Sequence, residues 1–68
     1  MAKVYTFLAD GMEEVECLGV CDVLARAGVE VKLVSVMGRR QVTGSHGFTV
    51  TADALFEETF SYTHLRAH

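Results

Sequence analysis

The chain has 68 residues, of which half are hydrophobic and 22% are charged, so it can form one small domain at most and is too apolar for a disordered tail. Its formal net charge is −3 at pH 7, and without a basic patch to neutralise phosphates we expect no nucleic-acid partner. No apolar run approaches the roughly 20 residues that cross a bilayer, and the N-terminus lacks the apolar core of a signal peptide, so neither a membrane partner nor export is expected.

The first predicted element is a strand over residues 3–9. It is apolar almost without interruption from Val4, which is typical of a parallel strand buried on both faces. The aromatic side chains of Tyr5 and Phe7 are therefore expected to face the core. The pair Asp10 and Gly11 ends the strand.

A helix is predicted over residues 13–27, because glutamates in its first turn complement the helix dipole. Gly28 suits the left-handed position that follows a last helical turn. The apolar residues form one broad stripe with more apolar surface beside it, so we expect the helix to be covered on more than one side. The stripe holds Val15, Leu18, Cys21, Leu24 and Ala25, and Cys17, Val20, Val23 and Ala27 lie beside it.

Several shorter elements follow the helix. A second strand is predicted over residues 29–36, and strand, helix and strand together make a βαβ unit. Short strands at 41–43 and 48–51 flank a glycine-containing loop, and a single helical turn is expected within 53–58. Because one helix cannot cover both faces of a parallel sheet, these elements are predicted to be an incomplete part of a larger α/β domain.

Three glutamates crowd the first strand-to-helix turn, where α/β sheets bind ligands. The turn lacks the glycine-rich and Walker motifs of nucleotide sites, and its carboxylates would repel a pyrophosphate. We interpret Glu13 and Glu14 as solvated groups that complement the dipole. Glu16 lies where the apolar positions begin, so we expect it to be partly buried and suited to share or shuttle a proton. On spacing alone, a solvated Glu16 and a functional one both remain open.

The two cysteines and the loop histidine are interpreted as structural residues. Cys17 and Cys21 lie four apart on the predicted helix and could offer two metal ligands, but a structural zinc needs four. We interpret them as packed, reduced thiols of a cytoplasmic protein, and we predict no metal and no cofactor. Ser45 and His46 could suggest part of a catalytic triad, but without a nucleophile elbow His46 is interpreted as structural or interfacial.

The last eight residues, 61–68, carry neither a strand nor a helix period. All eight match one reading frame of a common transposase sequencing adapter. We therefore predict that residues 61–68 are a non-native tail on a truncated gene and that His64 and His68 have no ligand role.

Residues 3–17 resemble the opening of the DJ-1/ThiJ/PfpI superfamily, and the patterns at 22–31 and 42–53 continue the similarity. Its most specific part is the G-x-E-E-x-E signature from Gly11 to Glu16. The resemblance covers about residues 2–58. It implies that residues 1–60 are the N-terminal, βαβ-containing part of a flavodoxin-like three-layer α/β sandwich, usually a homodimer.

The resemblance also implies site residues. Glu16 matches the glutamate that serves the family as acid/base partner of a reactive cysteine, which sits at a strained turn later in the family's chain. Neither Cys17 nor Cys21 occupies such a turn, so the chain by itself is predicted to be inactive. His46 lies in a loop that resembles the family's dimer-contact loop, from which it could reach a neighbour's site.

The family's activities imply a parent protein that is a cysteine-dependent glyoxalase or deglycase, acting on methylglyoxal or on glycated protein. The alternative is a non-catalytic oxidative-stress sensor or chaperone of the same family. A receiver domain shares the order of elements, but it needs paired acids after its first strand and an aspartate after its third. Asp10 stands alone and the loop at residues 44–47 has no aspartate, which disfavours that class.

Overall fold

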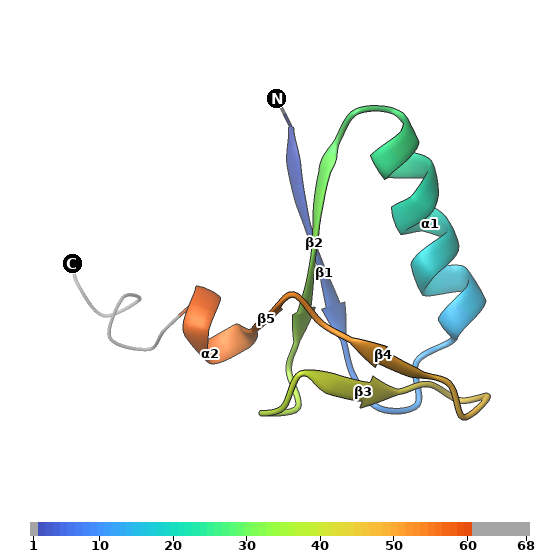
Figure 1. The fold of residues 1–68 in the computed structure, drawn as a ribbon, viewed down its shortest axis with the longest axis vertical. Coiled ribbons are helices and arrows are strands. Elements are labelled where there is room, and N and C mark those ends of the chain that lie inside the picture. The colour runs from blue at the N-terminus through green and yellow to red at the C-terminus, as the bar shows by residue number, and fades with distance from the viewer. Residues whose placement is uncertain (1, 61–68) are drawn as a thin grey trace.

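The computed structural model describes residues 2–60. The elements in chain order (Figure 1) are β1 (Lys3–Leu8), α1 (Glu14–Arg26), β2 (Glu30–Ser35), β3 (Gln41–Thr43), β4 (Thr49–Thr51), β5 (Ala54–Leu55) and α2 (Phe56–Thr59). The predicted order of strands and helices is confirmed, whereas the two-residue β5 was not expected because so short a strand has no periodicity. The predicted non-native tail at residues 61–68 lies outside the described residues, so its origin stays a prediction.

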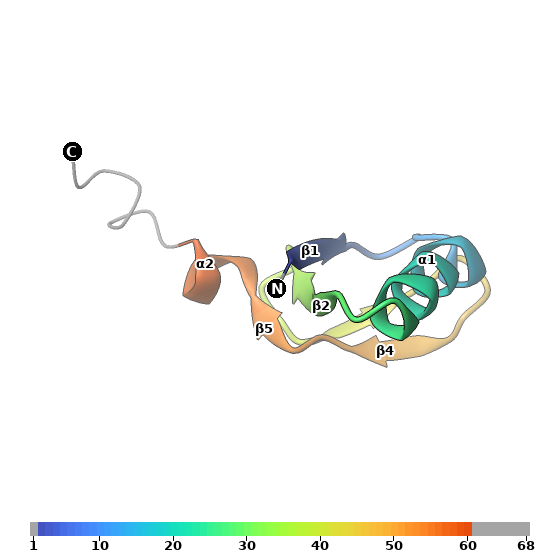
Figure 2. The same ribbon diagram turned by 90° about the horizontal axis from the view of Figure 1, so that it is seen from above.

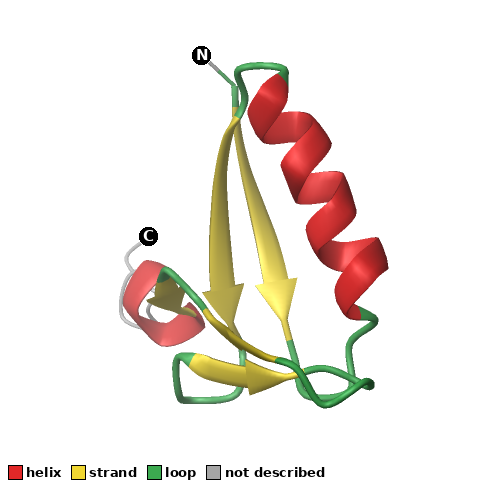
Figure 3. Ribbon diagram, turned by 45° about the vertical axis from the view of Figure 1, so that its right-hand side comes forward, coloured by secondary structure: helices red, strands yellow, loops and turns green. Residues whose placement is uncertain are grey.

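A three-stranded parallel sheet organises the molecule. Its strand order is β1-β2-β5, and β1 pairs with β2 along its whole length, from Lys3 opposite Glu30 to Leu8 opposite Ser35. Helix α1 connects these two strands and runs beside them on one side of the sheet (Figures 1 and 3). The expected βαβ unit of an α/β fold is therefore confirmed.

Both ends of α1 are capped by local sequence. At the start, the Glu13 carboxylate accepts the Val15 N–H at 3.2 Å. At the end, Gly28 has a φ of +87°, and its N–H and that of Val29 donate to carbonyls of the last turn at 3.1 and 3.0 Å. This is the Schellman arrangement, in which glycine takes the left-handed position without steric cost.

The buried side of α1 matches the expected stripe only in part. Glu14 and Cys21 are buried, and the Cys21 thiol lies 3.3 Å from the Thr6 hydroxyl of β1. Val15, which was expected in the stripe, is 77% exposed, and Val20 and Val23 are exposed as well. The expectation that α1 is covered on more than one side is therefore wrong for the described residues, because the side of the helix that carries these three valines faces solvent.

The opposite face of the sheet is sparsely covered. Tyr5 and Phe7 point to this face and are 36% and 52% exposed, so the expectation that they lie in the core is wrong, as is that of a strand buried on both faces. Their contacts come from the short helix α2: Tyr5 meets Phe60 at a ring-centroid distance of 5.0 Å, and Phe7 meets Phe56 at 5.9 Å. The molecule is a thin slab, 13 Å along its shortest axis (Figure 2).

The β3–β4 hairpin lies across the carboxyl ends of β1 and β2 (Figure 1). Leu8, Val42 and Ala52 form the buried core beneath it. Two backbone hydrogen bonds fasten the hairpin to the turn between β1 and α1: Gly11 N–H to the Thr43 carbonyl at 2.9 Å, and Ser45 N–H to the Met12 carbonyl at 2.7 Å. The turn and the hairpin loop therefore form one unit.

Candidate functional site at the first strand-to-helix turn

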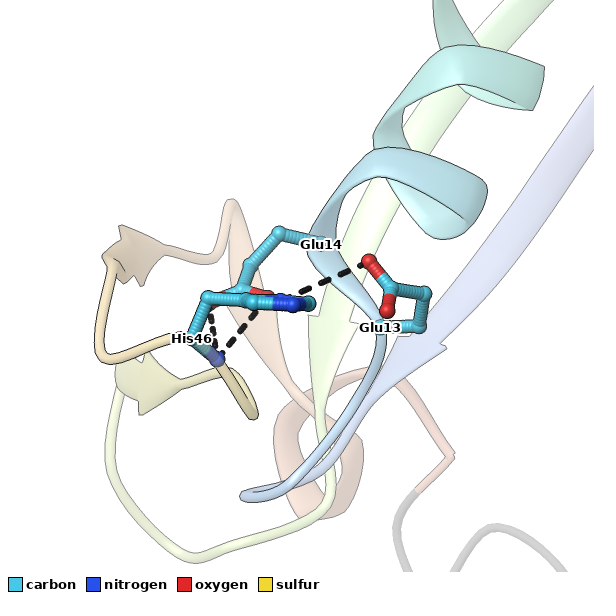
Figure 4. Close-up of side chains that lie close together, drawn as sticks. All are labelled: Glu13, Glu14 and His46. Carbon is cyan, nitrogen blue, oxygen red and sulfur yellow. Dashed lines mark hydrogen bonds and ion pairs between the residues drawn. The ribbon is translucent and has the colours of Figure 1, made fainter.

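A buried carboxylate, that of Glu14, lies at the centre of this unit. Glu14 is only 5% exposed, although it occupies the first residue of α1. Its Oε2 accepts the backbone N–H groups of His46 at 3.0 Å and Phe48 at 3.1 Å. Its Oε1 lies 2.9 Å from Nδ1 of the His46 ring, and Figure 4 shows the two side chains close together. The hairpin loop is thus wrapped around one side chain of the helix.

Gly44 creates the space that the Glu14 carboxylate occupies. A Cβ built on Gly44 would lie 2.2 Å from the carboxyl carbon of Glu14, far inside van der Waals contact. Any side chain at position 44 would therefore displace the carboxylate or the loop. Gly44 itself is buried.

The hydrogen bonds determine the protonation states of Glu14 and His46. Burial acts to raise the pKa of Glu14, but hydrogen bonds from the His46 ring, from its own backbone and from the Phe48 and His46 N–H groups together lower it to about 2. Glu14 is therefore ionised at neutral pH and can only accept, so Nδ1 of His46 carries the proton. The same bond, with the charges of Glu13 and Glu14, raises the pKa of His46 above its usual 6.5.

Glu13 completes the cluster from the exposed side. Its Oε1 lies 3.6 Å from His46 Nδ1, and the ligand atoms of Glu13, Glu14 and His46 all lie within 4.8 Å of one another. Two ligands of one tetrahedral zinc ion are about 3.3 Å apart, so the 2.9 Å between Nδ1 and Glu14 is the spacing of a hydrogen bond. Because the Glu14 oxygens and Nδ1 are already engaged, we assign no metal to this group.

The burial of Glu14 and Glu16 is the reverse of what the sequence suggested. Glu14, interpreted as a solvated group, is buried, and Glu16, expected to be partly buried, is exposed. Both interpretations are wrong in the described structure, because the N–H donors that draw Glu14 inward lie more than thirty residues away. The role of Glu16 as an acid/base partner stays a prediction.

The two cysteines lie on α1 as free thiols. Cys21 is buried, which confirms its interpretation as a packed thiol, and Cys17 is half-buried. Burial, with a smaller effect of Cys21, raises the pKa of the Cys17 thiol. Since the thiolate is the nucleophilic form, this environment does not activate Cys17.

Asp10 is a structural residue of the turn that sequence reasoning missed. It accepts the Thr43 N–H at 3.0 Å and pairs with the Arg39 guanidinium. These contacts, the backbone hydrogen bond first, lower the pKa of Asp10. An aspartate directly after a strand suggested a turn residue, but only the fold shows that it binds the hairpin.

The sequence model of the DJ-1/PfpI family matches residues 2–64. The chain belongs to the DJ-1/PfpI family. The expected family and the flavodoxin-like fold class are thereby confirmed. The match runs four residues into the segment predicted to be a non-native tail, so the boundary at residue 61 remains untested.

Solved DJ-1 structures carry the same fold. A cysteine-to-alanine mutant of a DJ-1 superfamily protein from Salmonella typhimurium is 33% identical with a TM-score of 0.83, over 85% of this chain and 31% of that one. Oxidised Toxoplasma gondii DJ-1 is 37% identical with a TM-score of 0.84, over 87% and 32%. A threonine-to-valine mutant of Schizosaccharomyces pombe DJ-1 is 30% identical with a TM-score of 0.78, over 85% and 31%.

This DJ-1/PfpI chain thus spans about a third of the length of the solved relatives and corresponds to the N-terminal part of their fold. Among curated proteins, none matches it significantly. Neither helix within residues 2–60 has the length and apolar character needed to cross a membrane.

Proposed function

We propose that these residues are the N-terminal part of a cysteine-dependent glyoxalase or deglycase, which acts on methylglyoxal or on its adducts with proteins. The observation that carries the proposal is the position of Glu16. It lies in the first turn of α1, at the carboxyl end of β1, where ligands of parallel α/β sheets bind. Glu16 is exposed, so its carboxyl group is free to meet a group supplied by the rest of the domain.

The proposed chemistry assigns one proton-transfer role to Glu16. A cysteine thiolate from the later part of the domain adds to the aldehyde carbonyl, and a carbon–sulfur bond forms as the carbonyl becomes a hydroxyl group. Glu16 takes the thiol proton and returns it to that oxygen, as a positioned acid/base does. Because neither Cys17 nor Cys21 can supply this thiolate, we expect no turnover of methylglyoxal by the 68-residue chain.

We also propose that the whole protein is a cytoplasmic homodimer. The outer face of α1 supports this, since Val15, Val20 and Val23 are 77%, 60% and 65% exposed and Gly19 between them leaves room for a close approach. An exposed apolar face of this kind marks an interaction surface. His46, on the adjoining loop, would then lie near a neighbour's site. We expect no nucleic-acid or membrane partner.

The test begins with the source DNA. Reads that span codon 59 should continue past Glu58 into a further strand, a turn with two adjacent glycines and the strained turn that carries the reactive cysteine (the cysteine elbow). Genomic reads that instead contain Ser61 to His68 and a natural stop codon would contradict the predicted tail and with it the longer enzyme.

The longer protein is then assayed for methylglyoxal consumption. We expect Glu16→Gln to lower kcat by about 10²-fold or more, with an unchanged unfolding midpoint. The control is Asp22→Asn, which removes an exposed carboxylate on α1 that pairs with Arg26, and it should keep full activity. Absence of turnover, or full activity of Glu16→Gln, would overturn the proposal.

A redox sensor is the second candidate, favoured by the oxidised state of the Toxoplasma gondii relative. In that case the longer protein would not consume methylglyoxal, but hydrogen peroxide would oxidise its elbow cysteine selectively. Peptide mass spectrometry after peroxide treatment distinguishes the two candidates, with Cys17 and Cys21 as internal references.

A further inference from the structure

The contacts of the His46 ring are asymmetric. Nδ1 faces the buried Glu14 carboxylate at 2.9 Å, while the His46 side chain is 59% exposed. Among the described residues, no hydrogen bond involves Nε2, on the other side of the ring. Since Nδ1 carries the proton, Nε2 of the neutral ring presents a lone pair to solvent.

We propose that Glu14 and His46 form a carboxylate–imidazole dyad, whose Nε2 accepts and returns the proton of a hydroxyl group on the aldehyde adduct. The identity of the substrate rests on the proposed function, whereas the dyad itself does not. Glu14 is the positioning residue of the pair, and His46 is the residue that would touch the substrate.

The proton transfer is balanced within the dyad. Neutral His46 donates Nδ1–H to Glu14 and takes the substrate hydroxyl proton on Nε2, which leaves an alkoxide and an imidazolium. The positive ring then faces Glu14 at 2.9 Å and Glu13 at 3.6 Å. Return of the proton restores the neutral ring, and no oxidant or reductant is needed.

The loop holds His46 firmly enough for this role. Glu14 binds both the backbone N–H and the ring of His46, so one carboxylate fixes the residue at two points. Ser45 donates its N–H to Met12, which holds the loop against the turn that leads to Glu16. Two further polar groups lie near Nδ1, the Ser45 hydroxyl at 3.3 Å and Glu13 Oε1 at 3.6 Å.

The dyad is tested first in the 68-residue chain by NMR with ¹⁵N-labelled histidine. We expect His46 to be protonated at Nδ1 when neutral, with a pKa above 6.5. Glu14→Gln should lower this pKa by about one unit or more, whereas Ser45→Ala should leave it unchanged. Neutral His46 with its proton on Nε2, or an unchanged pKa in folded Glu14→Gln, would overturn the dyad. The wild-type tautomer decides the point even if a variant unfolds.

The role in proton transfer is tested in the longer protein. The pH profile of kcat/KM should show an acidic limb at the NMR-derived pKa of His46. We expect His46→Gln to remove this limb and to lower kcat/KM about 10²-fold, and Glu14→Gln to move the limb to lower pH. Turnover that is indifferent to His46→Gln overturns the proton-transfer role and leaves the proposed function standing. If the wild-type protein has no turnover, the proposed function and the substrate assignment both fail. The NMR result then decides by itself whether Glu14 and His46 form a dyad.

Discussion

Glu14 illustrates how a charged side chain is accepted in a small interior. Burying an ion is costly unless hydrogen bonds replace its hydration, and here two backbone N–H groups and the His46 ring supply them. Gly44 contributes by having no side chain where the carboxylate lies. The loop conformation and the ionised Glu14 therefore depend on each other.

The first prediction concerns Gly44→Ala. The new Cβ would meet the Glu14 carboxyl carbon at 2.2 Å, so we expect a loss of about 1–3 kcal/mol in the free energy of unfolding, measured with urea. Ser45→Ala, in the same exposed loop, is the matched control and should change the free energy by under about 0.5 kcal/mol. In a Glu14→Ala background the cost of Gly44→Ala should shrink, and strictly additive effects would contradict the steric argument.

The second prediction is the pH dependence of stability. The pKa of Glu14 falls from 4.5 to about 2 on folding, so its contribution is complete above pH 4.5 and is lost as the pH falls toward 2. The pKa of His46 is raised from 6.5, so its contribution is complete below pH 6.5 and is lost as the pH rises through the raised value. The pair therefore stabilises most between pH 4.5 and 6.5.

Urea unfolding between pH 2 and 9 measures this profile. The difference between wild type and His46→Gln should show the alkaline loss, which the variant lacks. The difference between wild type and Glu14→Gln should show the acidic loss as well. An alkaline limb that persists unchanged in His46→Gln would assign it to another group.

At the scale of elements, α1 is the unit that links the sheet to the site. Its Schellman end at Gly28 directs the chain into β2, and its first turn meets the hairpin loop through Glu14. The hairpin in turn is fastened to the β1–α1 turn by Gly11 and Asp10. The first turn of α1 is therefore held in place by contacts with the hairpin as well as by hydrogen bonds within the helix.

The third prediction compares two glycine-to-alanine changes in this helix region. Gly28→Ala places a side chain at a φ of +87°, so we expect a loss of about 1 kcal/mol. Gly19 lies in the middle of α1 on its exposed side, and a Cβ added there would have no atom within 4 Å. Gly19→Ala should therefore stabilise the chain by about 1 kcal/mol. Thermal unfolding followed by circular dichroism measures both, and equal signs would contradict the assignment of Gly28 as the cap.

At the scale of the whole molecule, the sheet face away from α1 remains incomplete. Tyr5, Phe7 and Phe56 are each more than a third exposed, and α2 is the only helix on that side within residues 2–60. The chain spans about a third of its solved relatives, and parallel sheets are normally covered on both faces. Tyr5, Phe7, Phe56 and Phe60 together form an aromatic cluster on this face.

The fourth prediction is that this aromatic face binds an apolar dye. We expect the 68-residue chain to enhance the fluorescence of anilinonaphthalene sulfonate, and Phe7→Thr to reduce the enhancement. Phe48→Thr is the control, because Phe48 is 68% exposed on the hairpin, away from the aromatic cluster. Equal losses in the two variants would show that the dye does not report on this face.

The local features of this protein are encoded in short stretches of its sequence. Hydrophobic periods predicted strands β1 to β4 and the helix α1, and Gly28 predicted where α1 ends. The G-x-E-E-x-E signature predicted the family. Each of these signals lies in neighbouring residues. Tertiary structure decided which glutamate is buried and which aromatic residues are exposed. Those outcomes depend on Gly44 and the N–H groups of His46 and Phe48, which meet Glu14 only when the hairpin folds across the sheet. The exposure of the aromatic residues depends on how much of each sheet face the other elements cover, and a hydrophobic period along one strand cannot predict this.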